Sequence, residues 1–369
     1  MLYLHVPYCH RKCTYCAFYS AVTGADKQAY VDALCAELRQ RRDAMQHPLR
    51  TVYFGGGTPT ILSLAQLEQI VDCVEANYDL SVLEEATIEA NPEDLDTDFL
   101  QGLRSLGFFN RLSIGVQSFH DADLRLLNRR HTAQQSFEAV ERAFAQGFGN
   151  ISVDLIYALP GQDEADWNDN LAHLQRLPVS HLSAYSLSVE PGTMLERQID
   201  QGRIVPATDD MSVRHYQSLL AWGLEHGFEQ YEISNFCREG KRSLHNSRYW
   251  NRTPYLGVGA AAHSFDGHRR RWNVADVSQY INSCHKGGIS HETELLSVKD
   301  AYNEYVMISL RTVAGIDKAL VPNEYAATLS HDVGRFVSAG LIEETATHFR
   351  PTPDGLLHAD GIASELFLL

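Results

Sequence analysis

The sequence predicts an α/β protein: a partial (β/α)6 barrel followed by a smaller C-terminal α+β domain of the winged-helix type. Two observations lead to this fold class. Over residues 1–189, six short apolar runs alternate with amphipathic helices, as expected for parallel strands joined by right-handed crossovers. From residue 297, small helices are followed by a two-stranded ribbon. We expect a barrel domain at 1–235, a connecting region at 236–296 and a C-terminal domain at 297–369.

The barrel strands are predicted from β-branched and apolar runs, at residues 2–6, 51–54, 87–90, 111–116, 151–157 and 181–189. Helices are predicted between and after them, at residues 26–46, 64–77, 97–106, 122–128, 133–146 and 164–177. Ser63 and Gln66 have the spacing of a capping box, which marks the start of the second helix. Active sites of such barrels lie at the C-terminal ends of the strands, so functional residues are expected there.

The strand–helix rhythm stops near residue 191. Helices are expected at 193–201 and 209–226, and a β-like segment at 230–235. Beyond residue 297 the pattern predicts helices at 300–310, 323–330 and 333–339, then the ribbon. The acidic segment of this module argues against DNA binding and favours packing or docking.

Bulk composition limits the classes of function. The chain has 369 residues and a net charge of −16, from 31 basic and 47 acidic residues. This balance argues against non-specific binding to nucleic acid. No apolar run is long enough to span a membrane, although peripheral contact with a membrane stays compatible with the sequence. The first residues do not resemble a signal peptide, so we expect a reducing cytoplasm, where thiolates persist as metal ligands.

Three cysteines, Cys9, Cys13 and Cys16, form a CxxxCxxC run directly after the first predicted strand. A structural zinc ion takes four protein ligands and a disulfide takes two cysteines, whereas three thiolates on a [4Fe–4S] cluster leave one iron open. Such an iron can bind S-adenosylmethionine (SAM) and reduce it to a deoxyadenosyl radical. The alternative is a trio of small buried residues or an incomplete zinc site. Four other cysteines are scattered and are expected to be core residues: Cys35, Cys73, Cys237 and Cys284.

Polar residues and glycines follow the predicted strands. Three glycines at 55–57 precede Thr58, and such a turn can bring backbone amides to a carboxylate or phosphate. A plain tight turn is the alternative. The other strand ends supply further polar side chains, each of which could alone be a helix cap or a loop residue: Glu89, Asn91, Glu93, Gln117, Ser118 and Asp154. Together they predict a polar ring around the cysteine loop.

The ordered motifs resemble one subfamily of the radical SAM superfamily. They are YxHxPxCxxxCxYC at 3–16, GGGTP at 55–59, IEANPE at 88–93, RLSIGVQSF at 111–119, NRRH at 128–131 and DLIYALPGQ at 154–162. The subfamily contains oxygen-independent coproporphyrinogen III dehydrogenase and the HemW-type haem chaperone. The resemblance covers nearly the whole chain.

The resemblance implies a set of SAM contacts. Around the SAM nearest the cluster it implies Tyr3, Tyr15, Gly56, Gly57, Thr58 and Glu89. At positions that contact a second SAM in the dehydrogenase it implies Gln117, Arg129 and Asp154, with Ser188 as a looser match. Cys9, Cys13 and Cys16 are implied as the ligands of the [4Fe–4S] cluster.

Two features separate the branches of the subfamily. The dehydrogenase resembles CxxxCxxCxC, whereas the residue two beyond Cys16 is Phe18. The dehydrogenase also carries a longer N-terminal segment, whereas this sequence starts at its first strand. Both departures favour the chaperone branch.

His245 begins the run HNSRYW, which resembles the HNxxYW motif of the chaperone branch. A neutral imidazole beside Tyr249 and Trp250 is a sensible axial ligand and wall for haem. The alternative is a hydrogen-bonded loop histidine, and His263 is the next candidate ligand. The nearby GxGxxA run at 257–262 lacks the βαβ context of a dinucleotide site and predicts a close-packed turn beside the SAM pocket. The arginines at 269–271 are expected at an exposed hairpin end.

These expectations define two functions. The favoured one is a haem carrier that binds haem, a [4Fe–4S] cluster and SAM and passes haem to an acceptor protein, with a flavodoxin or ferredoxin as reductant. The alternative is an enzyme, coproporphyrinogen III dehydrogenase, which decarboxylates propionate side chains by radical chemistry. The two functions differ in whether the chain is an enzyme.

Overall fold

The computed structural model describes residues 1–22 and 26–368. Its main element is a nine-stranded sheet with strand order β11–β1–β4–β5–β6–β7–β8–β10–β9. Six of the strands pair in parallel in the order of the chain and curl into the partial barrel: β1 (Leu2–Val6), β4 (Thr51–Gly56), β5 (Glu85–Ala90), β6 (Arg111–Gln117), β7 (Ile151–Tyr157) and β8 (His181–Ser186). The predicted fold class is confirmed.

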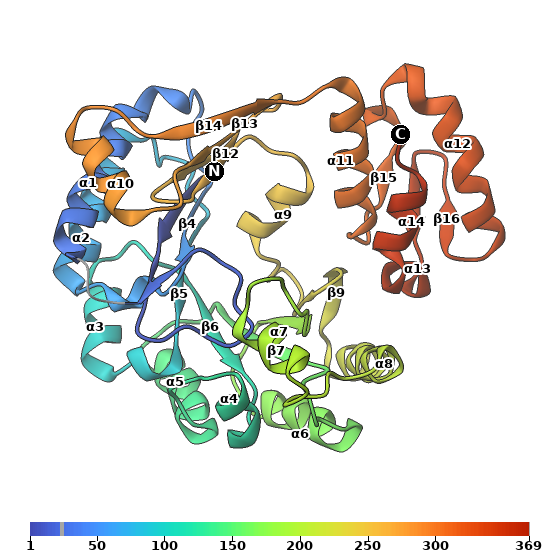
Figure 1. Cartoon of the computed structure of the whole chain (residues 1–369), viewed down its shortest axis with the longest axis horizontal. Coiled ribbons are helices and arrows are strands. Elements are labelled where there is room, and N and C mark those ends of the chain that lie inside the picture. The colour runs from blue at the N-terminus through green and yellow to red at the C-terminus, as the bar shows by residue number, and fades with distance from the viewer. Residues whose placement is uncertain (23–25, 369) are drawn as a thin grey trace.

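Helices cover the outer face of this sheet (Figure 1). They are α1 (Lys27–Gln40), α2 (Leu64–Asn77), α3 (Thr97–Ser105), α4 (Asp121–Leu126), α5 (Ala133–Ala145) and α6 (Glu164–Gln175). The capping box predicted at Ser63 and Gln66 is present at the start of α2. Short 3-10 turns occur at η1 (Arg42–Ala44), η2 (Pro59–Ile61) and η3 (Pro92–Asp94).

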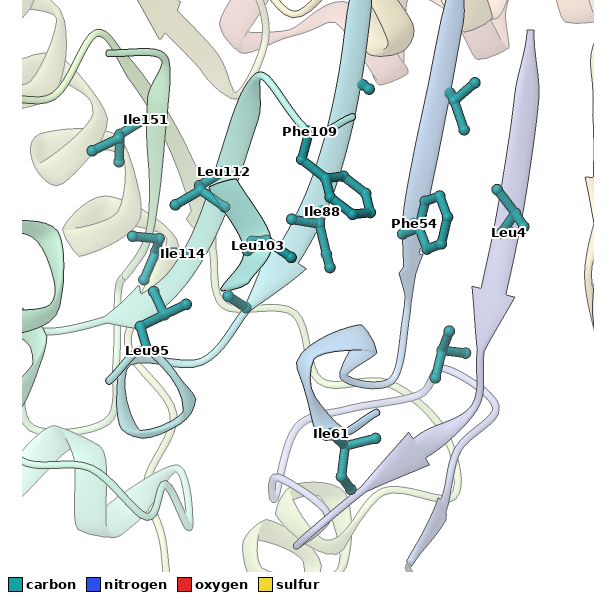
Figure 2. Packing of buried hydrophobic residues seen from close by; sticks show 14 of the residues in the cluster. Leu4, Phe54, Ile61, Ile88, Leu95, Leu103, Phe109, Leu112, Ile114 and Ile151 are labelled. Atoms are coloured by element: carbon teal, nitrogen blue, oxygen red, sulfur yellow. The ribbon is translucent and has the colours of Figure 1, made fainter. Parts of the chain in front are cut away.

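The strands alternate between an apolar outer face and a polar inner face. Figure 2 shows Leu4, Phe54, Ile88 and Leu112, from four neighbouring strands, in the layer that packs beneath the helices. The residues between them point to the barrel interior, where carboxyl, hydroxyl and phenol groups gather. This alternation determines which side chains can reach a ligand inside the barrel.

Residues 236–295 complete the barrel domain rather than linking it to the next. Strand β11 (Leu256–Val258) pairs in parallel with β1, and α10 (Val277–His285) packs on α1. A three-stranded sheet follows, made of β12 (His263–Phe265), β13 (Arg269–Asn273) and β14 (His291–Leu295). The expected domain end at residue 235 is therefore corrected, because the main hydrophobic core extends to Cys284. The arginines at 269–271 are the first residues of β13, directly after the turn that joins it to β12, so they lie at a hairpin end as expected.

The far edge of the sheet is antiparallel. It consists of β10 (Asn235–Cys237) and β9 (Glu229–Glu232), preceded by α7 (Met194–Asp200) and α8 (Asp209–His226). Both helices lie where the sequence predicts them. After β10 the chain turns into the barrel as α9 (Leu244–Trp250). A small pair of strands, β2 (Tyr8–Cys9) and β3 (Ala21–Val22), brackets the cysteine loop.

The C-terminal module has its own hydrophobic core and lies beside the barrel (Figure 1). Its helices are α11 (Val298–Leu310), α12 (Asn323–Ser338), α13 (Pro353–Leu357) and α14 (Ala359–Glu365), with the 3-10 turn η4 (Lys318–Leu320). Its strands are β15 (Ile316–Asp317), β16 (Ile342–Glu344) and β17 (His348–Pro351). The two helices expected at 323–330 and 333–339 form one helix, because no proline interrupts them and Leu329, Val333 and Phe336 share a buried face.

No helix in the described part of the chain has both the length and the apolar character needed to cross a lipid bilayer.

Candidate functional site

A cavity of about 640 Å³ opens at the C-terminal ends of the parallel strands. Twelve of the thirteen residues that the resemblance implies for the cluster and SAM line it, and they come from the cysteine loop, from β4 to β8 and from the segment after α4: Cys9, Cys13, Tyr15, Cys16, Gly56, Gly57, Thr58, Glu89, Gln117, Arg129, Asp154 and Ser188. Residues up to 179 positions apart in the sequence, Cys9 and Ser188, thus share one site. The placement of the site at this end of the barrel follows from the parallel topology.

Hydrogen bonds fix the cysteine loop to the segment at the end of α4. Thr14 donates its backbone N–H to Leu127 O at 3.2 Å and its hydroxyl to Leu126 O at 3.1 Å. The backbone N–H of Cys16 bonds to Cys13 O at 3.4 Å, which forms a turn between two of the thiols. The loop therefore presents its half-buried thiols to the cavity from a fixed backbone.

Each of two thiols has a polar neighbour. Arg129 Nη1 lies 3.4 Å from Cys13 Sγ, and Thr58 Oγ1 lies 3.7 Å from Cys9 Sγ. Burial raises the pKa of Cys9 and of Cys16, so these thiols hold their protons until a metal replaces them. Within residues 1–22 and 26–368, no three His, Cys, Asp or Glu side chains converge on a point where they could hold a single metal ion.

The donor set fits a cluster with one open iron. Three thiols share the cavity, and the remaining four cysteines are buried in the core elsewhere: Cys35, Cys73, Cys237 and Cys284. A [4Fe–4S] cluster spreads its irons over several ångströms, so its thiolate ligands need not meet at one point.

Glu89 lies on the floor of the cavity and is held by two donors. Tyr53 Oη donates to one carboxylate oxygen at 2.7 Å, and the backbone N–H of Gly56 donates to the other at 3.0 Å. Burial raises the pKa of Glu89 to about 7, and the nearby charge of Asp154 adds to this shift. A cation in the cavity would therefore meet a carboxyl group that ionises near neutral pH.

The glycine turn differs in one respect from the sequence expectation. Gly56 has φ +110° and donates its N–H to Glu89, while Gly57 donates its N–H to Val6 O at 2.8 Å. These two amides are occupied within the protein and are not turned toward a ligand. Glycine is needed at 57 for close packing, because a Cβ there would lie 2.6 Å from Tyr8 O.

Arg129 connects the ends of two strands, β5 and β6, to the cysteine loop. Its Nη2 donates to Asn91 Oδ1 and to Gly115 O, both at 2.6 Å, in addition to the contact with Cys13. The adjacent Gln117 has φ +69°, which ends β6 with its side chain at the cavity. Arg129 thus fixes the relative positions of the cysteine loop, β5 and β6.

Asp154 is a second carboxyl group with a raised pKa. It accepts a hydrogen bond from Ser113 Oγ at 3.4 Å, and burial raises its pKa to about 6. Ser113 and Tyr185 also line the cavity, and neither is among the residues predicted from the sequence. The signal for Ser113 was available, because in the run RLSIGVQ it occupies the polar face between Arg111 and Gly115.

Tyr3 and Tyr15 were both expected beside SAM, and only Tyr15 lines the cavity. Tyr3 lies deeper in the barrel, where its ring centroid is 6.1 Å from that of Tyr53 and its hydroxyl is 3.0 Å from His5 Nδ1. Tyr53 packs against Tyr3 and donates to Glu89, so Tyr53 lies nearer the cavity floor than Tyr3 does. The structure therefore does not bring Tyr3 to the site.

His245 lies at the opposite end of the barrel. It is fully buried, and its Nδ1 and Nε2 are 2.9 Å from Thr51 Oγ1 and 3.1 Å from Tyr249 Oη. Thr51 is the first residue of β4, whereas the cavity lies at the last. Burial lowers the pKa of His245 to about 3, so the imidazole is neutral. In this conformation it matches the alternative of a hydrogen-bonded histidine.

The GxGxxA run is a close-packed turn, as predicted. A Cβ at Gly257 would lie 1.9 Å from His263 O, and Gly259 has φ +111°. The turn packs against β1 and does not line the cavity, so its expected place beside the SAM pocket is corrected. His263 itself is exposed, with its ring stacked on Trp272 at 5.9 Å.

The chain matches two family models and known proteins over most of its length. Residues 3–174 match the model of the radical SAM superfamily, and residues 296–358 match the HemN C-terminal domain. The heme chaperone HemW of Lactococcus lactis is 35% identical over 85% of this chain and 82% of its own length. HemW of Bacillus subtilis is also 35% identical, over 89% and 87%.

A solved structure extends the comparison to the fold. The radical SAM enzyme coproporphyrinogen III oxidase (HemN) of Escherichia coli matches with a TM-score of 0.84 and 25% identity, over 99% of this chain and 89% of that one. Sequence relatives at this level of identity and coverage establish common descent. The chain therefore belongs to the radical SAM superfamily, in the family of the heme chaperone HemW.

Proposed function

We propose that this protein is a haem chaperone, which binds a [4Fe–4S] cluster, SAM and haem and passes haem to an acceptor protein. The observation that carries this proposal is the family relationship over most of both chains, combined with the cavity that joins three thiols to Glu89, Arg129 and Asp154. Phe18 supports the chaperone branch, because it lines the cavity where the dehydrogenase pattern has a fourth cysteine.

Cys9, Cys13 and Cys16 would hold the cluster, which when bound supplies one-electron reduction of the SAM sulfonium. Arg129 would keep Cys13 in place through its bonds to β5 and β6. The positions proposed for SAM binding are those that line the cavity: Tyr15, Gly56, Gly57, Thr58, Glu89, Gln117, Arg129, Asp154 and Ser188.

Glu89 and Asp154 would select a cationic ligand. Both are buried carboxyl groups, with pKa values of about 7 and about 6. A sulfonium and an ammonium group would favour the ionised forms, so binding the cation would draw protons off the cavity floor. This role needs no movement of the strands.

Haem is the cargo in this proposal, and His245 is its proposed ligand. Imidazole is a common axial ligand of haem iron, and Tyr249 and Trp250 offer large apolar faces. Ligation requires α9 to leave its present position, because both ring nitrogens are engaged. The proposed partners are an acceptor haem protein, and a flavodoxin or ferredoxin as reductant, in the cytoplasm.

The experiment combines two assays on protein reconstituted with iron and sulfide. Ferric haem is added, the protein is desalted, and the Soret band is recorded before and after mixing with haem-depleted myoglobin as a generic acceptor. We expect haem to survive desalting and then to appear in the globin. In parallel, coproporphyrinogen III is incubated with protein, SAM and dithionite under argon, and no protoporphyrinogen IX is expected.

Coproporphyrinogen III dehydrogenase is the second candidate, supported by the match to the Escherichia coli oxidase over nearly the whole chain. Formation of protoporphyrinogen IX in the second assay would establish this activity and overturn the carrier proposal. Loss of all haem on desalting would also overturn it.

A further inference from the structure

Helix α9 closes the barrel at the end where the strands begin, and its N-terminus is held by a buried carboxylate. Glu85, at the start of β5, is 2% exposed. It accepts the backbone N–H of Leu244 at 2.8 Å, that of His245 at 2.9 Å and the hydroxyl of Ser243 at 3.4 Å. A carboxylate at this position satisfies free N–H groups of the first turn and complements the helix dipole.

The His245 side chain anchors the middle of α9 inside the barrel. Besides its contacts with Thr51 and Tyr249, its ring lies 5.0 Å from that of Tyr53. The iron of a haem needs a free nitrogen lone pair and room for a flat macrocycle next to it. Neither exists here while α9 is seated, so haem can reach His245 only in a second conformation.

The other end of α9 is held by the C-terminal module. Arg252 has φ +53° just after the helix, and its Nη1 donates to Ala301 O at 2.8 Å and to Glu304 Oε2 at 2.9 Å. Both partners belong to α11. Glu304 also pairs with Arg270 of β13, so one carboxylate joins the module to the loop after α9 and to the barrel domain.

A second contact links the same two elements. The Arg311 guanidinium, at the end of α11, lies 5.9 Å from the centre of the Trp250 ring. Residues Trp250 and Arg252 therefore both face α11, on the side of α9 away from Glu85. Any outward movement of α9 must break the contacts of Arg252 or carry α11 with it.

We propose that α9 is a gate over the haem-binding histidine, and that Glu304 of the C-terminal module holds it shut through Arg252. This inference rests on the proposed haem binding at His245. When a binding-competent state is only partly populated, the apparent affinity falls by the populated fraction. Weakening the Glu304 contact should therefore increase the apparent affinity for haem.

The test compares Glu304→Gln with Glu344→Gln in the full-length, cluster-reconstituted protein. Glu344 is a matched control, because it makes an exposed ion pair with Lys318 in the same module and does not touch α9. Ferric haem binding is followed by stopped-flow at the Soret band. We expect Glu304→Gln to raise the apparent affinity roughly five-fold, the effect of one weakened charged hydrogen bond on the open fraction. Glu344→Gln should match the wild type.

A double variant separates gating from general loosening of the fold. Adding His245→Ala to Glu304→Gln should remove the gain in affinity, whereas a nonspecific haem site would keep it. Equal affinities in wild type and Glu304→Gln, or a gain that survives His245→Ala, would overturn the gate. If the wild-type protein retains no haem at all, the proposed haem-chaperone function is refuted, and with it the gate, which depends on haem binding.

Discussion

Replacing Glu89 by Gln tests the electrostatic role of the cavity floor. Glutamine keeps the size of the side chain, and its single amide oxygen can still accept the N–H of Gly56, while its amide NH2 can donate to the Tyr53 hydroxyl. It cannot carry a negative charge. Because the pKa of Glu89 is raised to about 7, the wild-type carboxyl group is neutral below that pH and ionised above it. SAM is a cation, so its affinity should rise as pH rises through 7.

The size of the effect follows from the ionised fraction. With a pKa of about 7, Glu89 is ionised in roughly one tenth of molecules at pH 6 and nine tenths at pH 8. If only the ionised form attracts the sulfonium, the affinity for SAM increases about nine-fold over this interval. In Glu89→Gln the increase should disappear. Asp154, with a pKa of about 6, contributes a further change of about two-fold in both proteins.

Calorimetric titration of SAM at pH 6, 7 and 8 provides the assay, with the cluster intact in both proteins. The ratio of the two Kd values at each pH cancels the titration of the amino group of SAM itself. Unbound protein gives a second readout. The pKa of Glu89 is higher in the folded than in the unfolded state, so the folded protein loses stability as pH rises toward the folded-state pKa. The Tm of the wild type should therefore fall more between pH 5 and 7 than the Tm of the variant. If the ratio of the variant Kd to the wild-type Kd did not change with pH, Glu89 would not be the group that attracts SAM.

Three further outcomes are expected. Cys13→Ala should abolish the brown chromophore of the cluster and its SAM-dependent electron spin resonance signal. Cys73→Ala, a change at a buried thiol of α2, should keep both. A full cluster in Cys13→Ala would contradict the proposed cluster ligands. Gly57→Ala should weaken SAM binding and lower the Tm, because the new methyl would lie 2.6 Å from a backbone oxygen; unchanged binding and Tm would argue against the tight packing of this turn. Tyr280→Phe should reduce the free energy of unfolding by about 1 kcal/mol, because Glu37 then loses a 2.7 Å hydrogen bond in the core. Urea titration measures this change, and an unchanged urea midpoint would show that the bond adds no net stability.

The position of the site could be predicted from the sequence because it depends on local patterns. Strand runs are visible in their β-branched composition, and in a parallel barrel all strand ends meet on one side. Polar residues within or just after these runs, such as Glu89 and Asp154, are therefore expected to share a site with the cysteine loop. The cap of α2 could also be inferred, since a capping box is encoded within four residues.

Other features depend on contacts between distant residues and could not be inferred. Nothing near residue 256 signals that β11 will pair with β1, so the barrel domain was expected to end too early. Tyr3 lies one layer of inward-facing side chains too deep to reach the cavity. Its ring packs against Tyr53, and it is Tyr53 that contacts Glu89 on the cavity floor. The burial of His245 results from Thr51 and Glu85, which are 194 and 160 residues away in sequence.

The pairing of β11 with β1 has a consequence for the order of folding during synthesis. Strand β1 has one unpaired edge until residues 256–258 have left the ribosome, although its other neighbour, β4, is complete by residue 56. An open edge of apolar strand is prone to pairing with other chains, and domains generally fold as units once their sequence is available. The cysteine loop extends directly from this strand. Nascent chains stopped before residue 256 should therefore aggregate or recruit chaperones, and insertion of the cluster into a stable loop should follow late in translation.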